Sequence, residues 1–326
     1  MSMFSVASMT SHNHDSRAHG TAKDVLGVLE TLATGWANGD TAALAGVFTK
    51  SSELYSSAHG EARGASDIAA VFSTDFAPDS AKSFGITTTN HYVGGNDERA
   101  VLTSYLYGVS PQRGPAASVF GATLLADLVR TDVGWRIETL RLSIPWTDGH
   151  PARFDKWTLP SVEGWKLGDP TPTIVSELDS PWARGIPDLD PDDAVRQAAD
   201  FYSRYSWAID QGDITLLSDC FTEDAFGSFP PMGDRQGRHD VIGQMKSFRR
   251  LWPWMQHFGR PLKITVDEAG TTGHLVVGRI IPQQPTTPTG RDLYGAHYQL
   301  DLRRENGTWR ISRFDYIPGW ISPTEE

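Results

Sequence analysis

The strongest constraint on the fold is an internal repeat, because the sequence resembles itself when it is shifted by 173 residues. Gly39-Asp40 falls on Gly212-Asp213, and Phe48-Thr49 falls on Phe221-Thr222. The single positions that also match are Leu44 with Leu217, Gly64 with Gly237, Asp67 with Asp240 and Val93 with Val266. Since no gap is needed along this stretch, the repeat predicts one fold used twice.

Each copy begins with helical periodicity. Residues 25–32 and 195–209 carry apolar side chains at the spacing of an amphipathic helix. The Gly-Asp pair that follows predicts a helix end and a new start, so we expect a second, short helix there. A third helix is predicted to begin near Ser66 in the first copy and near His239 in the second.

The later part of each copy changes to strand periodicity. The predicted strands are residues 86–93, 99–110, 122–130 and 134–144 in the first copy, and 262–268, 274–281, 293–304 and 308–317 in the second. Helices followed by a run of strands, without alternation, indicate an α+β fold with an antiparallel sheet. A parallel, doubly wound sheet is disfavoured.

Composition excludes several classes of function. The 326 residues include 29 Lys and Arg against 40 Asp and Glu, a net charge of −11, which argues against a protein that neutralises nucleic-acid phosphates. No apolar run approaches the roughly 20 residues of a membrane span, and the first residues do not resemble a secretion signal. The single cysteine, Cys220, excludes a disulfide framework within the chain. We therefore expect a cytoplasmic protein with no membrane partner.

The chain divides into four predicted parts. Residues 1–20 form a polar tail, 21–149 the first copy, 150–190 a connector and 191–326 the second copy. The connector is rich in proline and contains Trp157, Trp165 and Trp182. Because exposed tryptophan is costly, we expect the connector to pack on a domain surface.

The phrases AIDQGDITLLSDCFTEDA and GTWRISRF in the second copy resemble the SnoaL-like branch of the nuclear-transport-factor-2-like superfamily. The resemblance implies that each copy is a cone of three helices on a curved, four-stranded antiparallel sheet around an apolar pocket. This branch includes scytalone dehydratase, bile-acid dehydratase and hexachlorocyclohexane dehydrochlorinase. Because such proteins pair through their sheets, it also implies an intrachain pseudo-dimer of the two copies, with a homodimer as a further option.

The resemblance also implies a catalytic set of His257, Asp210 and Tyr205. A neutral imidazole is a base near physiological pH, and a carboxylate bonded to its second nitrogen fixes the tautomer. Tyr205 would donate a hydrogen bond where negative charge develops. This chemistry suits a lyase of the dehydratase type, acting without metal or organic cofactor on a hydrophobic cyclic small molecule.

Each of the three residues also has a structural interpretation. Asp210 precedes a Gln-Gly turn and could serve as a helix-terminating group. Tyr205 could be core packing, and His257 a hydrogen-bonded histidine at a strand entrance. Isomerisation or cyclisation of a polyketide or terpenoid in secondary metabolism, and non-catalytic binding of a small ligand, remain alternative functions.

Five further residues are predicted to bind substrate: Tyr202, Trp254, His297, Tyr298 and Arg303. His297 and Tyr298 point to opposite faces of one strand, so only one of these faces lines a pocket. Arg303 is similar in place to a pocket arginine of the dehydrochlorinase, although an arginine on the strand surface fits the pattern as well.

The first copy lacks the catalytic set. By the same offset it has Leu32 for Tyr205, Ala37 for Asp210 and Phe84 for His257. His59 and His91 remain, but no charged partner of His91 is visible in the sequence. We therefore expect a degenerate first copy with a supporting role.

Overall fold

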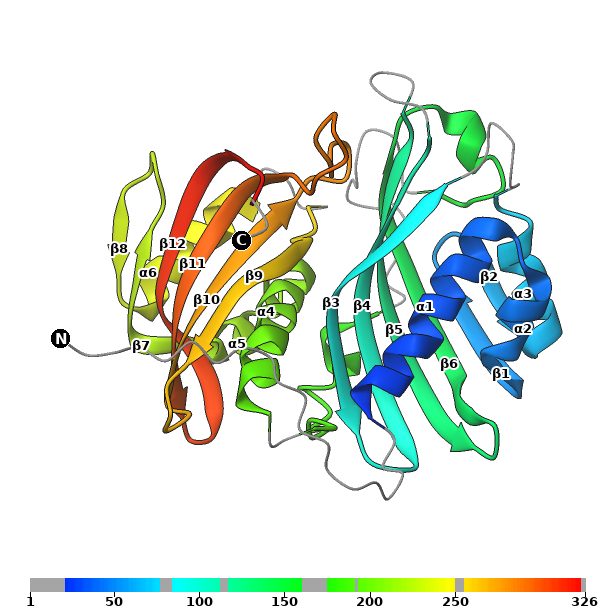
Figure 1. The fold of residues 1–326 in the computed structure, drawn as a ribbon, viewed down its shortest axis with the longest axis horizontal. Coiled ribbons are helices and arrows are strands. Elements are labelled where there is room, and N and C mark those ends of the chain that lie inside the picture. The colour runs from blue at the N-terminus through cyan, green and yellow to red at the C-terminus, as the bar shows by residue number, and fades with distance from the viewer. Residues whose placement is uncertain are drawn as a thin grey trace.

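The structure is a computed structural model that describes residues 21–76, 84–111, 117–159, 175–190, 193–249 and 255–323. The predicted tail, Trp165 and Trp254 lie outside these residues. Two groups of helices and strands follow one another along the chain (Figure 1).

The first group contains α1 (Ala22–Asn38), α2 (Thr41–Gly46), β1 (Phe48–Ser56), β2 (Gly60–Arg63), α3 (Ala65–Ser73), β3 (Gly85–Gly95), β4 (Arg99–Val109), β5 (Val119–Thr131) and β6 (Gly134–Asp148). The second contains α4 (Ala194–Gln211), α5 (Ile214–Asp219), β7 (Phe221–Ser228), β8 (Asp234–Gln236), α6 (Arg238–Arg249), β9 (Gly259–Val266), β10 (Thr272–Ile280), β11 (Tyr294–Glu305) and β12 (Thr308–Ile321). Two short 3-10 helices, η2 (Pro151–Phe154) and η3 (Glu177–Asp179), lie between the groups.

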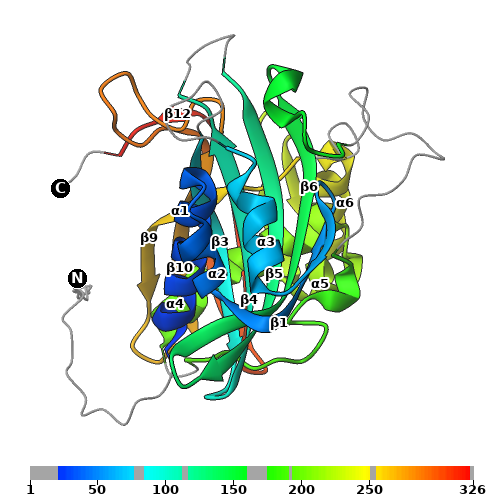
Figure 2. The same cartoon turned by 90° about the vertical axis from the view of Figure 1, so that its right-hand side faces the viewer.

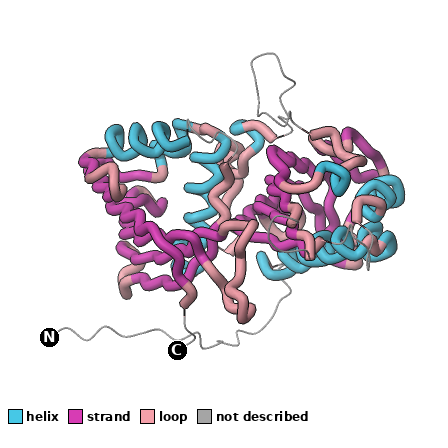
Figure 3. The backbone as a smooth tube through the Cα atoms, turned by 90° about the horizontal axis from the view of Figure 1, so that it is seen from above, coloured by secondary structure: helices cyan, strands magenta, loops and turns pink. Residues whose placement is uncertain are grey.

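Each group forms one sheet, and the two sheets share the same strand order. The orders are β2-β1-β6-β5-β4-β3 and β8-β7-β12-β11-β10-β9. The α+β class and the repeated fold are thereby confirmed. Seen from above, the strands of each half form one group flanked by helices (Figure 3).

The expectation of four antiparallel strands per copy was wrong in two details. Each sheet has six strands, and β1 and β7 run parallel to β6 and β12. The missed strands are short or rich in polar residues, as in FTKSSELYS, and β1 and β7 pair with segments far away in the sequence. Local periodicity carries no signal of such pairing.

The repeated Gly-Asp pair has a clear local function. Gly39 and Gly212 end α1 and α4 in the left-handed conformation, with φ of 64° and 71°. Asp40 and Asp213 then cap α2 and α5 by accepting hydrogen bonds from main-chain N–H groups. The pair thus makes the corner between two helices in both halves.

Helix α4 lies between the two sheets (Figure 1). One face of the first sheet packs on α1 and α3, which Figure 2 shows in front of it. The opposite face, which includes Val101, Tyr105 and Leu125, joins the core of the second half. The expected sheet-to-sheet pair within the chain is therefore wrong: the first half presents a sheet face and the second half presents a helix.

Two of the three tryptophans of the connector, Trp157 and Trp182, pack on the two halves as expected, whereas Leu178 is 76% exposed. Phe154 and Trp157 are buried in the core of the first half. Val175 and Trp182 pack against the core of the second half.

Candidate functional site

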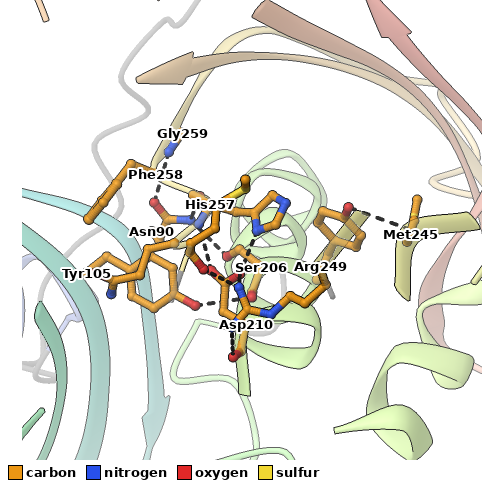
Figure 4. Close-up of polar contacts among 12 residues, drawn as sticks. Asn90, Tyr105, Ser206, Asp210, Met245, Arg249, His257, Phe258 and Gly259 are labelled. Atoms are coloured by element: carbon orange, nitrogen blue, oxygen red, sulfur yellow. Dashed lines mark hydrogen bonds and ion pairs between the residues drawn. The ribbon is translucent and has the colours of Figure 1, made fainter. Parts of the chain in front are cut away.

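His257 and Asp210 lie together where the C-terminal turn of α4 meets the segment before β9. The Nδ1 atom of His257 is 2.5 Å from Oδ1 of Asp210, and the main-chain N–H of His257 donates to Oδ2 at 2.6 Å. Their side chains are 11% and 3% exposed. Among the described residues no hydrogen bond engages Nε2 of His257, which points away from Asp210 (Figure 4). One nitrogen of the ring is oriented and the other is available.

Burial and neighbouring charges set the protonation of this pair. Burial lowers the pKa of His257, and the positive charge of Arg279 lowers it further, although Asp210 acts in the opposite direction. Burial alone would raise the pKa of Asp210, but His257 and Arg249 outweigh it and hold that pKa below its ordinary value. The pair at neutral pH is therefore a neutral imidazole beside a carboxylate.

Arg249 is a member of the site that sequence reasoning missed. Its Nη1 donates to Oδ1 of Asp210 at 3.3 Å, and its Nη2 donates to the carbonyl oxygen of Asp210 at 2.5 Å. It also bonds to the carbonyl oxygen of Met255. The guanidinium thus links the C-terminal end of α4 to the segment that carries His257, and its positive charge keeps Asp210 ionised.

The main chain around His257 is held by side chains from both halves. The carbonyl oxygen of His257 accepts hydrogen bonds from Nδ2 of Asn90 at 2.9 Å and from the hydroxyl of Tyr202 at 3.1 Å. The N–H of Gly259 donates to Oδ1 of Asn90 at 3.1 Å. Gln256 is buried and reaches the first sheet, where it bonds to Thr123. These contacts fix the main chain that carries the imidazole, and two of the residues that make them, Asn90 and Thr123, belong to the first sheet.

Arg279 in β10 is a buried cation of the site. It is 7% exposed and donates to the carbonyl oxygens of Phe258 at 3.2 Å and of Gln256 at 3.3 Å. Its guanidinium lies 5.9 Å from the ring centre of Tyr298. Among the described residues no carboxylate forms an ion pair with it. The site therefore has a positive charge that acts on His257, a feature that no sequence motif marked.

The three tyrosines predicted for the site gather next to His257. The ring of Tyr205 packs edge-on against the imidazole at 6.2 Å between centres, and its hydroxyl lies 3.8 Å from the sulfur of Met245. Tyr202 contacts both Tyr205 and Tyr298 through its ring. Burial raises the pKa of Tyr205 well above its ordinary value, so the phenol stays protonated and can donate.

The structure does not bring His297 and Arg303 to this cluster. Side chains alternate along β11, and Tyr298 faces the core. His297 and Arg303 are on the opposite face, where Arg303 is 39% exposed and pairs with Asp224 at 2.6 Å. Trp254, the remaining predicted residue, lies outside the described residues.

The first half holds a buried histidine and aspartate of its own, which sequence reasoning missed. His59 Nε2 lies 2.8 Å from Oδ2 of Asp75, and Trp36 Nε1 donates to the same oxygen at 2.7 Å. However, Nδ1 of His59 is 2.7 Å from the hydroxyl of Ser56, so both ring nitrogens are engaged. Rings of Trp36, Phe72 and Trp157 pack around the imidazole. This pair is built into the core, whereas His257 keeps one nitrogen available.

A cleft of about 700 Å³ lies away from His257, beside the N-terminal half of α4. Aromatic side chains of Tyr92, Trp182 and Trp309 line it together with polar residues that include Asp200 and Arg204. Burial is the main cause that raises the pKa of Asp200 to about 7. This cleft between the halves was not predicted, because its walls come from four separate parts of the chain.

The described residues lack two kinds of feature, a metal-binding cluster and a membrane-spanning helix. They contain no group of three or more His, Cys, Asp or Glu side chains placed to hold a metal ion. None of their helices has the length and apolar character needed to cross a membrane.

Comparison with known proteins matches residues 193–315 to the SnoaL-like domain, and these residues include α4 and β7 to β11. No match was found among curated protein sequences. Similar solved structures include a hexachlorocyclohexane dehydrochlorinase from Novosphingobium barchaimii, with 12% identity over 39% of this chain and 87% of that one and a TM-score of 0.34. Another is an NTF2-like protein with a cystatin-like fold from Novosphingobium aromaticivorans, with 16% identity over 41% of this chain and 86% of that one and a TM-score of 0.33. The first half repeats the strand order of the second. The match in sequence shows that the second half of the chain is a SnoaL-like domain.

Proposed function

We propose that this protein is a lyase that needs no cofactor and eliminates water from a hydrophobic cyclic small molecule. The observation that carries this proposal is the neutral, buried His257, which is bonded to Asp210 through Nδ1 and has Nε2 available. An oriented imidazole of this kind is suited to abstract a proton from carbon.

The proposed reaction follows from the groups around the imidazole. Nε2 of His257 takes a proton from the carbon next to a carbonyl group, and Asp210 stabilises the imidazolium that forms. The electrons of the C–H bond form a C=C bond as the neighbouring C–O bond breaks, and the leaving oxygen takes the proton from the His257 imidazolium, so that water leaves and the neutral imidazole is restored. Tyr205 donates a hydrogen bond and Arg279 provides positive charge where negative charge develops.

In this proposal the halves have different roles. The boundaries are those expected from the sequence: a supporting domain at 21–149, a connector at 150–190 and a catalytic domain at 191–326. The engagement of both nitrogens of His59 supports a structural role for the pair in the first half. Tyr202 and Tyr298 are the proposed substrate contacts that the geometry supports best.

The test uses 3-hydroxy-1-tetralone, which gives 1-naphthol when it loses water, so that turnover is read from absorbance. We expect the wild type to catalyse this loss and His257→Ala to lower the rate by about 10² to 10⁴-fold. His274→Ala is the matched control, because His274 also bonds to an aspartate, Asp301, at 2.8 Å but lies on the more exposed face of its sheet. Full turnover by a folded His257→Ala protein would falsify the proposal.

The alternative enzyme class, an isomerase or cyclase, uses the same base. We would measure the exchange of the α-protons of 1-tetralone in D₂O by NMR. Exchange that depends on His257, with no elimination from the hydroxylated probe, favours isomerisation or cyclisation.

A non-catalytic binding module is the second candidate function, and the cleft beside Tyr92 and Trp182 favours it. Mass spectrometry of small molecules that copurify with the full chain tests this reading. A bound molecule that is lost in Trp182→Ala but retained in His257→Ala would place the ligand in the cleft.

A further inference from the structure

A local irregularity in β3 brings one side chain of the first half to the catalytic segment of the second. The pairing of β3 with β4 shifts register between Thr89 and Tyr92, and Asn90 adopts a positive φ of 55°. Asparagine tolerates this left-handed conformation better than most residues do. The irregularity turns the buried Asn90 side chain out of its own sheet toward α4 and residues 257–259.

The side-chain amide of Asn90 forms hydrogen bonds with three residues of the second half. Its Nδ2 donates to the carbonyl oxygen of His257 at 2.9 Å and to the hydroxyl of Ser206 at 2.8 Å. Its Oδ1 accepts from the N–H of Gly259 at 3.1 Å. The hydroxyl of Thr89 also donates to Oδ1, which fixes the orientation of the amide. A single side chain thus joins the His257 segment to α4 (Figure 4).

The contact with α4 matters because Ser206 lies one turn before Asp210. Tyr105, also from the first half, donates to the carbonyl oxygen of Ser206 at 3.1 Å. The first half therefore makes two kinds of contact. Asn90 and Tyr105 bond to Ser206 near the end of α4, and Asn90 also bonds to the main chain of His257. The distance between Asp210 and the imidazole depends on both.

The main chain of residues 257–259 lies beside aromatic rings. Phe258 packs against Tyr105 and Tyr107. A Cβ atom at Gly259 would come within 2.4 Å of the Tyr202 ring, so the segment has no room to move toward that side. Loss of the Asn90 amide would leave the N–H of Gly259 without this acceptor, and the segment would relax toward water.

We propose that Asn90 is a positioning residue of the active site, supplied by the first half, which sets the geometry of the His257–Asp210 pair. This inference rests on the proposed function for its effect on rate, but its geometric part can be measured without turnover.

The experiment compares Asn90→Gly with Asn306→Gly in the full chain. Asn306 is the other described non-glycine residue with positive φ, at 52°, and it lies in the turn between β11 and β12. Glycine accepts this conformation in both places, so only the first variant loses contacts to the site. Ser203→Ala is a second control, because its hydroxyl bonds to the carbonyl oxygen of His91 across the same interface without touching residues 255–259.

Three readouts are expected to move in Asn90→Gly and not in either control. NMR titration should show the pKa of His257 rising toward its ordinary value of about 6.5, because water gains access to the ring. The amide of Gly259 should lose protection from hydrogen exchange. The kcat for 3-hydroxy-1-tetralone should fall by about tenfold to a hundredfold, with a smaller change in KM.

Asn90→Asp serves if the glycine variant does not fold. Aspartate fits the same backbone conformation and keeps an acceptor for Gly259, but it cannot donate to the carbonyl oxygen of His257. A pKa of His257 and a Gly259 amide unchanged in both Asn90 variants would overturn the inference, whatever the rates. If these two readouts move while His257→Ala keeps full turnover, the positioning stands and only the proposed function fails.

Discussion

The carboxylate of Asp210 holds His257 twice, by the imidazole Nδ1 at 2.5 Å and by the main-chain N–H at 2.6 Å. The same side chain therefore fixes both the ring and the backbone that carries it. Asp210 is itself held at the end of α4 by Arg249. The geometry of the His257–Asp210 pair is thus determined by the protein itself.

Asp210→Asn should preserve the fold and lower kcat by about 10² to 10⁴-fold. The amide has the shape of the carboxylate and keeps one of its two acceptor oxygens, but it carries no charge to stabilise an imidazolium, so proton abstraction loses its driving force. Turnover of 3-hydroxy-1-tetralone and circular dichroism measure the two effects. Asp301→Asn, in the exposed pair with His274, is the control, and equal rates in the two variants would contradict the role of Asp210.

Arg279→Gln should raise the pKa of His257, because a like charge is removed while the glutamine amide can still donate to a carbonyl oxygen. Histidine imidazole signals followed by NMR give this pKa directly. The acidic limb of the pH–rate profile should move to higher pH, since the neutral base then forms later. Arg303→Gln, which alters an exposed ion pair, should leave both unchanged. A constant pKa in Arg279→Gln would show that its charge does not act on the base.

Tyr205→Phe should separate rate from stability. The hydroxyl has a weak acceptor, the Met245 sulfur at 3.8 Å, so its loss should change the free energy of unfolding by about 1 kcal/mol or less. If Tyr205 stabilises developing charge, kcat should fall by about 10²-fold. Tyr55→Phe, which removes a hydroxyl bonded to Glu53 in the first half, controls for the loss of a phenol. A normal rate in Tyr205→Phe would leave that residue a packing role.

The interface between the halves should weaken in acid through His91. Burial lowers the pKa of His91 to about 4, and its Nε2 has no hydrogen-bond partner among the described residues. Between pH 6.5 and 4 the unfolded chain binds a proton that the folded protein does not, so stability falls as the pH falls. The loss attributable to this group is about 3 kcal/mol at pH 4.

Urea unfolding of wild type and His91→Gln at pH 7 and pH 4 measures this loss. The variant has no titrating group there and should lose less stability than the wild type over this range. His239→Gln, at an exposed position in α6, should behave as the wild type does. Parallel losses in all three proteins would assign the acid sensitivity elsewhere.

Asp75→Ala should destabilise the first half without removing the chemistry of the second. It leaves the N–H groups of Trp36 and His59 without their buried acceptor, which we expect to cost about 3 kcal/mol or more. Asp67→Ala, at an exposed position in the first turn of α3, should cost less than about 1 kcal/mol. Turnover at temperatures where the variant is folded should stay close to that of the wild type. A folded Asp75→Ala protein without activity would indicate that the first half takes part in the reaction.

Local sequence patterns were sufficient for most of the elements. The repeat, the Gly-Asp corners and the four later strands of each copy follow from short-range rules, because glycine permits a left-handed cap and aspartate accepts from free N–H groups. The strands β1 and β7 escaped prediction because their partners lie far along the chain. The placing of Tyr205, Asp210 and His257 came from a family resemblance, since five residues on a regular helix do not bring two side chains to one side.

The sequence by itself predicted a duplicated α+β fold and placed the candidate site residues in its second copy. Only the tertiary structure decided which of them meet. In the structure Asp210 bonds to His257, whereas His297 and Arg303 lie on the face of β11 that is turned away from the site. Arg279 and Arg249 are site residues that only the structure revealed. It also decided that the first half reaches the site through Asn90, because a contact across 167 residues depends on how two sheets pack around one helix, and no local pattern encodes that packing.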